Sequence, residues 1–193
     1  MTQRAIFLDR DGTINVDVGY PGRYEQITIY EGNFEALRRI NAAGFLAVVV
    51  TNQSGIGRGF LTEDDVRDIH AGMSAAFLAR GARIDAFYYC PHYDLSEIPR
   101  YRSDCSCRKP KPEMARRAAA DLGLDLSRSY MIGDKIEDVE FGLAAGLRPV
   151  LVRTGYGASA EIKLRERGIA PAAVAATLLE AVNWILTRDP ERR

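Results

Sequence analysis

The sequence predicts an α/β fold, a doubly wound and mostly parallel sheet with helices on both faces. Short apolar runs with strand character alternate with longer amphipathic segments along the 193 residues, a pattern typical of parallel sheets covered by helices. Four of the helical segments are followed by a glycine, namely Gly44, Gly81, Gly123 and Gly146. Glycine is the residue that most often ends a helix, so the segment boundaries support the same fold class.

Each predicted strand is an apolar run bounded by turn-forming residues. The predicted strands are residues 5–9, 45–51, 86–90, 130–133 and 149–153. The predicted helices have apolar residues at helical spacing and lie near 33–43, 62–80, 112–122 and 137–145, with a last helix around 172–186. Thr62 precedes three acidic residues, which predicts an N-cap and an acidic first turn.

Length and composition are those of one soluble globular domain, so we expect residues 1–193 to form a single unit without a separate cap domain. Lys plus Arg and Asp plus Glu both number 26. No net field therefore attracts nucleic acid or an anionic membrane, and neither is expected as a partner. The first residues resemble neither a signal peptide nor a membrane span, which predicts a cytoplasmic protein.

The first predicted strand ends in two acidic residues, Asp9 and Asp11, followed by Gly12 and Thr13. In open parallel sheets, ligands bind at the carboxyl ends of the strands. Two carboxylates this close resist joint ionisation unless a cation lies between them. The stretch therefore indicates either a metal-dependent reaction with an Asp nucleophile or, as the plainer alternative, an Asp-Gly turn after a core strand.

Polar side chains follow three other predicted strands at the same edge. Each group alone has a plain alternative, such as a capped turn, a helix start or a solvated base. Together they would bring hydroxyl and amide donors, a cation and a metal-binding acid beside Asp9 and Asp11. The residues concerned are Thr51, Asn52, Gln53, Ser54, Arg108, Lys109, Asp134, Lys135 and Asp138. The glycines of segment 54–59 either cradle a phosphate through backbone N–H groups or only allow a sharp exit from the strand.

Three cysteines and one of the two histidines lie within eighteen residues, at Cys90, His92, Cys105 and Cys107. An odd number of clustered cysteines favours a metal site or a reactive thiol over disulfides. Three thiolates and an imidazole suit a structural zinc ion, and the alternative is buried free thiols beside an incidental histidine. Zinc would fold a loop poor in apolar residues and fix the basic residues that follow it. The other histidine, His70, is expected to be structural or solvent-facing.

These groups occur in the order found in the haloacid dehalogenase-type phosphatases, which the chain resembles over residues 6–138. Within them it is most similar to the branch that holds D-glycero-D-manno-heptose-1,7-bisphosphate 7-phosphatases and histidinol-phosphate phosphatases. The strings that carry the resemblance are DRDGTIN at 9–15, TNQSGIGRG at 51–59, CPH at 90–92, CSCRKP at 105–110 and GDK at 133–135. The resemblance also implies the zinc-bound loop.

The resemblance implies catalysis through an aspartyl-phosphate. Asp9 would attack phosphorus. Asp11, protonated at the outset, would protonate the leaving oxygen and then activate water. Magnesium would bind the carboxylate of Asp9, the backbone carbonyl of Asp11 and Asp134, with Asp138 orienting the water shell of the metal.

Phosphoryl transfer depends mainly on positioning and charge stabilisation, and Thr51 and Lys109 would contact the phosphoryl oxygens. Loops would select the substrate, expected to be a small phosphorylated sugar, with the 7-phosphate of heptose bisphosphate, a lipopolysaccharide precursor, implied by the resemblance. Arg108 and Lys135 would meet a second anionic group, with surface charge as the alternative. The expected substrate-binding residues are Asp17, Val18, Gly19, Tyr20, Thr51, Asn52, Gln53, Ser54, Arg108, Lys109 and Lys135.

Three other functions are compatible with the sequence. A histidinol-phosphate phosphatase shares the zinc-loop pattern. Polynucleotide 3′-phosphatases resemble segment 51–59, although the zero net charge and the lack of interleaved aromatic and basic residues argue against a nucleic-acid groove. The third is a zinc-stabilised binding module without activity. A monomer or a weak homo-oligomer is expected.

Overall fold

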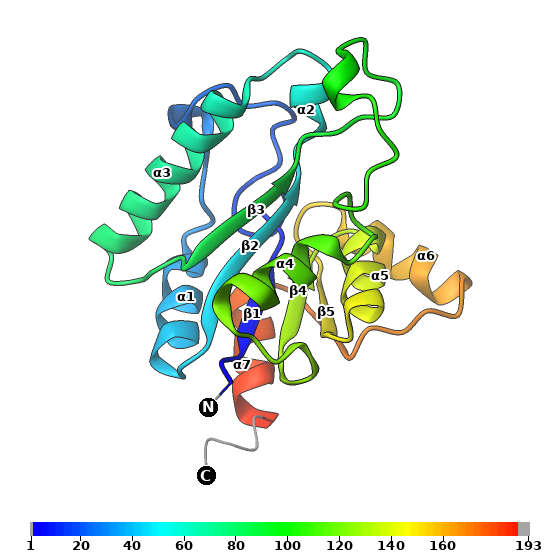
Figure 1. The fold of residues 1–193 in the computed structure, drawn as a ribbon. Coiled ribbons are helices and arrows are strands. Elements are labelled where there is room, and N and C mark those ends of the chain that lie inside the picture. Colours follow the sequence, from blue (N-terminus) through cyan, green and yellow to red (C-terminus); the bar gives the residue numbers. More distant parts are fainter. Residues whose placement is uncertain (1, 189–193) are drawn as a thin grey trace.

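The computed structural model describes residues 2–188, and they build a six-stranded parallel sheet with helices on both faces (Figure 1). The order across the sheet is β3-β2-β1-β4-β5-β6. The strands are β1 (Ala5–Leu8), β2 (Leu46–Asn52), β3 (Ala86–Cys90), β4 (Tyr130–Gly133), β5 (Arg148–Val152) and β6 (Ala173–Ala175). The predicted fold class is confirmed.

Within residues 2–188 the chain also forms seven α-helices and three short 3-10 turns; α7 follows the last strand, and the others lie between strands. The helices are α1 (Gly32–Ala42), α2 (Ser54–Gly57), α3 (Glu63–Ala79), α4 (Glu113–Leu122), α5 (Ile136–Ala145), α6 (Gly157–Glu166) and α7 (Leu178–Arg188). The 3-10 turns are η1 (Tyr24–Gln26), η2 (Pro99–Tyr101) and η3 (Leu126–Arg128). Buried residues of α1, α3 and α7 share one apolar cluster, and those of α4 and α5 share another on the opposite face of the sheet.

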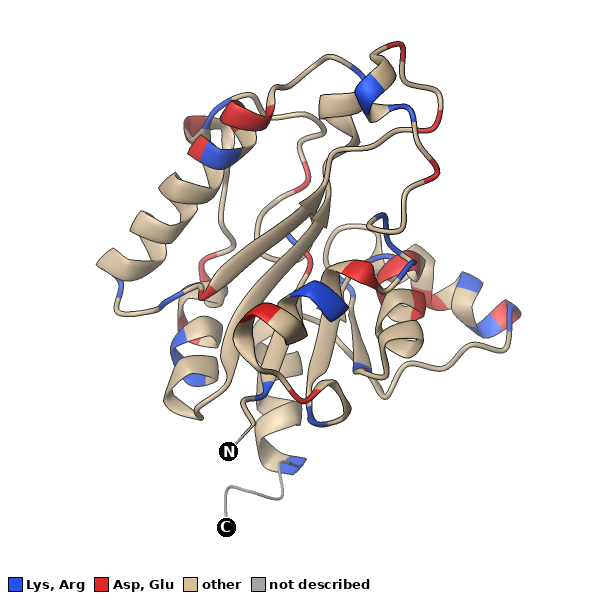
Figure 2. Cartoon of the chain, in the orientation of Figure 1, with Lys and Arg blue, Asp and Glu red and all other residues tan. Residues whose placement is uncertain are grey.

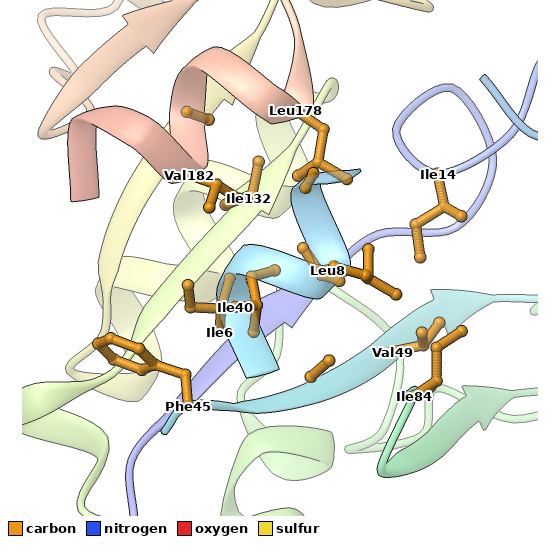
Figure 3. Packing of buried hydrophobic residues seen from close by; sticks show 14 of the residues in the cluster. Ile6, Leu8, Ile14, Ile40, Phe45, Val49, Ile84, Ile132, Leu178 and Val182 are labelled. Atoms are coloured by element: carbon orange, nitrogen blue, oxygen red, sulfur yellow. The ribbon is translucent and has the colours of Figure 1, made fainter. Parts of the chain in front are cut away.

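Strand β1 shows why the strands of this sheet are unbroken apolar runs in the sequence. All four of its residues are 0% exposed, with Ile6 and Leu8 in one cluster and Ala5 and Phe7 in the other. Both faces of a parallel strand are covered by helices, so alternation with polar residues is lost. Figure 3 shows the first of these clusters, where residues of three strands face the helices α1 and α7. The labelled strand residues are Ile6, Leu8, Val49 and Ile132, and the facing helix residues are Ile40, Leu178 and Val182.

The end of the chain differs from the prediction. The helix expected around 172–186 begins only at Leu178, and the residues before it form β6, which pairs with β5. Helix α6 was not predicted. It buries only Gly157, Ala160 and Leu164, so its sequence lacks a clear apolar stripe. Strand β6 is three residues long and alanine-rich, and so short an apolar segment does not distinguish strand from helix.

Helix ends follow the predicted signals. The Thr62 side chain accepts a hydrogen bond from the Asp65 backbone, and the Asp65 side chain accepts one from the Thr62 backbone, which forms a capping box at the start of α3. Gly123 and Gly146 end α4 and α5 in the left-handed conformation.

Nearly all charged residues lie in the helices and loops. Figure 2 shows basic and acidic residues interspersed there, and the six strands contain one charged residue, Arg148. Within residues 2–188, no helix has both the length and the apolar content needed to cross a bilayer. The carboxyl ends of β1, β2 and β4 meet at one edge of the sheet, and α2 lies beyond that edge (Figure 1).

Candidate active site

Asp9 lies directly after β1 at this edge. Its backbone N–H donates to the carbonyl of Ile132 on β4 (2.9 Å), which extends the pairing of the two strands by one residue. The residue is 4% exposed, and Oδ1 of its side chain accepts a hydrogen bond from Nζ of Lys109 at 2.7 Å. The predicted nucleophile is therefore held through one oxygen at the base of the site.

Lys109 comes from the loop between β3 and α4, and its ammonium group connects three segments. Nζ donates to Oδ1 of Asp9, to Oδ1 of Asp138 (2.6 Å) and to the carbonyl of Val50 (2.9 Å). Burial acts to lower the pKa of Lys109, but the carboxylates of Asp138 and Asp9 outweigh it and hold the pKa above its usual value. Lys109 is therefore a permanent buried cation beside the nucleophile.

Asn52 holds the backbone of Lys109 rather than facing the centre of the site. Its Nδ2 donates to the Lys109 carbonyl (3.2 Å), and its Oδ1 accepts from the Lys109 backbone N–H (3.0 Å). Both polar atoms of the amide are thus engaged with one residue. This pair ties the end of β2 to the loop that carries the lysine.

Three buried carboxylates, those of Asp9, Asp134 and Asp138, have oxygen atoms within 4.8 Å of one another. Burial, followed by the charges of Asp9 and Asp138, raises the pKa of Asp134 to about 7. Burial and the charge of Asp9 raise the pKa of Asp138 to about 6, against the opposing effect of Lys109. The acids repel one another, which is the electrostatic signature of a site that favours a cation.

The surroundings of Asp134 fit a small, hard cation. A Cβ at Gly12, where φ is +90°, would lie 2.3 Å from its Oδ2, and one at Gly155 would lie 2.2 Å from it. Only glycine therefore allows the backbone to approach this carboxylate on both sides. Oxygen-only donors in a tight, buried arrangement suit Mg²⁺, so the residues present fit the expected ion.

Asp11 is surrounded by hydrogen-bond donors. Nε and Nη2 of Arg10 bond to its two oxygens at 2.8–3.1 Å, and Asn15 and Gln53 each add a bond of 3.0 Å. Burial acts to raise the pKa of Asp11, but Arg10, Asn15 and Gln53 hold it below its usual value. This differs from the expectation that Asp11 starts protonated, because nothing in the sequence indicated that the side chain of Arg10 would turn inward and bond to it.

Gln53 links the two halves of the site. The same Nε2 that reaches Asp11 also donates to Oγ1 of Thr51 at 2.9 Å. Thr51 is 1% exposed at the end of β2, next to the lysine side of the site. The predicted hydroxyl donor and the predicted acid are thereby joined through one amide.

A cavity of about 360 Å³ opens above these groups. Its walls include most of the predicted catalytic and substrate-binding residues, whereas Val18 is half-exposed and does not line it. Gly55, from the glycine segment considered above as a phosphate cradle, also lines the cavity, as do Glu137 and Tyr156, which were not predicted. The predicted residues in the wall are Asp9, Asp11, Asp17, Gly19, Tyr20, Thr51, Asn52, Gln53, Ser54, Arg108, Lys109, Lys135 and Asp138.

Two basic side chains lie at the rim of the cavity. Nζ of Lys135 pairs with Oδ2 of Asp17 at 3.2 Å and lies 5.3 Å from the ring centre of Tyr156. Nη1 of Arg108 donates to the carbonyl of His92 at 3.4 Å. The guanidinium of Arg108 keeps further donors for a ligand, because Arg has five N–H groups.

The cysteine cluster lies at the base of the loop between β3 and α4. Its sulfur and Nδ1 atoms are 3.3–3.7 Å apart in the contacts Cys90–Cys105, Cys105–Cys107, Cys107–His92 and Cys90–His92. A tetrahedral site with Zn–S bonds of about 2.3 Å requires ligand separations of roughly this size. The Cys90 side chain beside it holds the pKa of Cys107 down to about 5, against the opposing effect of burial. The donor set fits zinc.

Two residues near the site were not recognised as functional from the sequence. Arg10 is 0% exposed and His70, on α3, is 6% exposed. Of the two alternatives expected for His70, structural or solvent-facing, the structure excludes the second, because the residue is buried. A fully buried arginine has no pattern of its own in a sequence, and the only available signal was its position between two acids.

Comparisons with known proteins show the family of the chain. A family model described as HAD-hydrolase-like matches residues 106–181. A D-glycero-beta-D-manno-heptose-1,7-bisphosphate 7-phosphatase from Pasteurella multocida is 45% identical over 154 residues, which is 79% of this chain and 83% of that protein. The enzyme of the same name from Escherichia coli (strain K12) is 45% identical over 152 residues, 78% of this chain and 80% of that protein.

Solved structures of similar proteins share the whole fold. A D,D-heptose 1,7-bisphosphate phosphatase from B. bronchiseptica, complexed with magnesium and phosphate, has a TM-score of 0.84 and 30% identity, covering 96% of this chain and 99% of that chain. A phosphatase of that name from Burkholderia thailandensis has a TM-score of 0.69 and 29% identity, covering 96% and 100%. The chain belongs to the D-glycero-beta-D-manno-heptose-1,7-bisphosphate 7-phosphatase family, a group of phosphatases within the HAD-like hydrolases.

Proposed function

We propose that this phosphatase removes the 7-phosphate of D-glycero-D-manno-heptose 1,7-bisphosphate in two steps, through a phosphate ester on Asp9. The observation that carries the proposal is the identity of about 45% to phosphatases of that name over some four-fifths of the chain. The geometry supports it, because a carboxylate, a buried lysine and an acid triad meet under one cavity. The names of these relatives specify the beta anomer, which we propose as the preferred one.

In the first step, an oxygen of Asp9 attacks phosphorus while the bond to the sugar oxygen breaks. Oδ1 is held by Lys109, which leaves the other oxygen for the attack. The neighbours of Asp11 favour its ionised form in the free site; the negative charge of the bound ester would raise its pKa, and the protonated carboxyl would then give its proton to the departing sugar oxygen, as a general acid. Thr51 and Lys109 stabilise the charge that builds on the phosphoryl oxygens.

In the second step, water attacks phosphorus and gives its proton to Asp11, the bond between phosphorus and Asp9 breaks, and inorganic phosphate leaves. Mg²⁺ held by Asp9, Asp134 and the backbone carbonyl of Asp11 would offset the repulsion between the acids and the phosphate. Asp138, fixed by Lys109 and by the Lys135 backbone N–H, would orient the surrounding water.

The second phosphate of the substrate would lie at the rim. Arg108 and Lys135 are its proposed partners, because they line the cavity and carry donors suited to phosphate. Tyr20, with Asp17 and Gly19, would form the adjacent wall. We propose that residues 1–193 form one domain without a lid. In such a chain, the loops around the cavity would select the substrate.

Zinc held by Cys90, His92, Cys105 and Cys107 would have a structural role, because four protein ligands leave no open position. We further propose that the enzyme acts in the cytoplasm, where thiols stay reduced, and that it is a monomer or a weak homo-oligomer without a nucleic-acid or membrane partner. The interspersed charges in Figure 2 support the last point.

A panel of esters tests the assignment. With Mg²⁺ present, the kcat/KM for heptose 1,7-bisphosphate should exceed that for histidinol phosphate and that for a 3′-phosphorylated oligonucleotide. The kcat/KM for the beta anomer of the heptose should exceed that for the alpha anomer. Asp9→Asn should abolish release from all of them. Higher kcat/KM for histidinol phosphate would replace the substrate assignment, and release by the Asp9→Asn variant would overturn the mechanism. No release from any ester would favour the inactive binding module.

A further inference from the structure

Arg10 is the largest fully buried side chain among residues 2–188. Arginine is almost never buried unless it is paired, and its partner here is its neighbour Asp11. Nε lies 3.1 Å from both carboxylate oxygens, and Nη2 lies 2.8 Å from Oδ2. A planar guanidinium that bonds both oxygens fixes the plane of the carboxylate as well as its position.

Arg10 does not itself line the cavity, whereas Asp11 does. Its effect on a bound ester must therefore pass through Asp11. Asn15 and Gln53 also bond to the carboxylate, each with one neutral N–H. Asn15 bonds Oδ1 and Gln53 bonds Oδ2, so these neutral contacts help to hold the carboxyl plane. The guanidinium adds a charged contact to both oxygens from one rigid, planar group.

His70 anchors the guanidinium from the opposite side. Its Nε2 is 3.4 Å from Nη1 of Arg10, across sixty positions of sequence. Because a guanidinium has donors only, this nitrogen must accept. The imidazole is stacked on Phe87 of β3, with ring centres 4.3 Å apart and an angle of 16°, and its edge contacts Tyr89. The orientation of Arg10 is thereby fixed to α3 and β3.

We propose that Arg10, anchored by the imidazole of His70, is a positioning residue that aims the carboxyl group of Asp11 at the leaving oxygen of the ester. The inference rests on the proposed function, in which Asp11 is the general acid. It assigns a role to two buried side chains that have no contact with the substrate. It also explains why a charged residue is fully buried in the turn that follows β1.

The test compares two esters of similar shape that differ in their need for an acid, phenyl phosphate and p-nitrophenyl phosphate. The phenol oxygen of the first is a poor leaving group, and the nitrophenol oxygen of the second departs without a proton. The value of kcat/KM reports the steps up to leaving-group departure. For Arg10→Lys with Mg²⁺ bound, kcat/KM for phenyl phosphate should fall by about 10²-fold and that for p-nitrophenyl phosphate by less than about threefold. Arg67→Lys, an exposed arginine on α3, is the matched control and should change neither.

A double-variant cycle shows whether the effect passes through Asp11. Asp11→Asn should give the same dependence on the leaving group, and adding Arg10→Lys to it should give no further loss for phenyl phosphate. Equal losses for the two esters, or independent effects of the two substitutions, would overturn the inference. Activity in Asp9→Asn would instead overturn the proposed function, so the two failures are distinct.

Substitutions of His70 test the anchor without removing the counter-charge of Asp11. His70→Gln keeps an acceptor near the position of Nε2, and His70→Phe keeps the stack on Phe87 without it. The Gln variant should keep kcat/KM for phenyl phosphate within about threefold of the parent. The Phe variant should lose about tenfold with this ester and little with p-nitrophenyl phosphate. If Arg10→Lys fails to fold by circular dichroism, this pair decides, and a similar loss for both variants or both esters overturns the inference.

Discussion

At the scale of single residues, the site depends on buried charged side chains, each of which is paired with groups of opposite charge or with hydrogen-bond partners. Lys109 is 4% exposed and joins the end of β1, the backbone of β2 and the first turn of α5 through one ammonium group. Removing one member of a buried ion pair is costly, because it leaves the other charge without compensation. The residue is therefore important to the folded state as well as to phosphate binding.

Lys109→Met should reduce both turnover and stability. Loss of a donor to the phosphoryl oxygens is expected to lower kcat by about 10²–10³-fold, and the buried charges of Asp9 and Asp138, left without their counter-ion, should lower the free energy of unfolding by about 3–5 kcal/mol. Phosphate release and urea unfolding measure the two effects. Arg67→Met is the control, since its exposed pair with Asp64 contributes less than about 1 kcal/mol. Parent-like stability and kcat in Lys109→Met would contradict this role.

His70 should make stability depend on pH. Burial, with the charge of Arg10, lowers its pKa to about 3, against the weaker opposing effect of Asp11. The unfolded chain has its usual value near 6.5 and binds the extra proton between these limits. This contribution to stability is thus fully present above about pH 6.5 and is lost as pH falls toward 3.

The loss should be roughly 2 kcal/mol between about pH 7 and pH 5. His70→Gln cannot titrate, so its free energy of unfolding should fall by that much less over the same interval. Urea unfolding of both proteins at the two pH values gives the difference. Parallel pH profiles would show that His70 is not held neutral by its surroundings.

At the scale of elements, the loop between β3 and α4 packs Tyr101 and Ile98 into a small apolar cluster, whereas the part that carries Lys109 is held by polar and sulfur contacts. The cysteine cluster joins its two ends, Lys111 donates to the Cys105 carbonyl, and Asn52 bonds the Lys109 backbone on both sides. Cys107, a member of the cysteine cluster, lies only two residues before Lys109 in the sequence. Loss of the cluster should therefore reach the site.

Cys107→Ala should lower zinc content, melting temperature and kcat together. The reason is that three ligands bind zinc more weakly than four, and the loop then loses the restraint on Arg108 and Lys109. Metal analysis, thermal unfolding and phosphate release measure the three effects. Ser106→Ala, an exposed residue between two of the ligands, is the control. A zinc-free variant with unchanged kinetics would refute the coupling between loop and site.

Elements with strong local signals could be predicted from the sequence, and weakly patterned ones could not. The five longer strands are apolar runs with turn residues at their ends, and α3 has a capping box at its start. Helix α6 and strand β6 have few buried residues, so their formation depends on packing against β5. That packing is set by the rest of the fold and leaves little trace in local sequence.

At the scale of the whole molecule, topology assembles the site. Strands β1, β2 and β4 are adjacent in the sheet although they are far apart in the sequence, so the general rule for parallel sheets predicted which residues would meet. The partners of those residues could not be predicted in the same way. The contact between Arg10 and His70 exists because α3 packs on the face of the sheet beneath the site, and no local pattern encodes it.

The central claim is that Asp9 carries the phosphoryl group between the two steps. The most direct measurement is a single turnover with excess enzyme and Mg²⁺, quenched in acid at successive times, with peptide mass spectrometry of the segment around residue 9. We expect a phosphate adduct on Asp9 that forms and decays as fast as product appears, and that accumulates further in Asp11→Asn, which lacks the base for the second step. Normal ester cleavage with no adduct on Asp9 at any time would contradict the account.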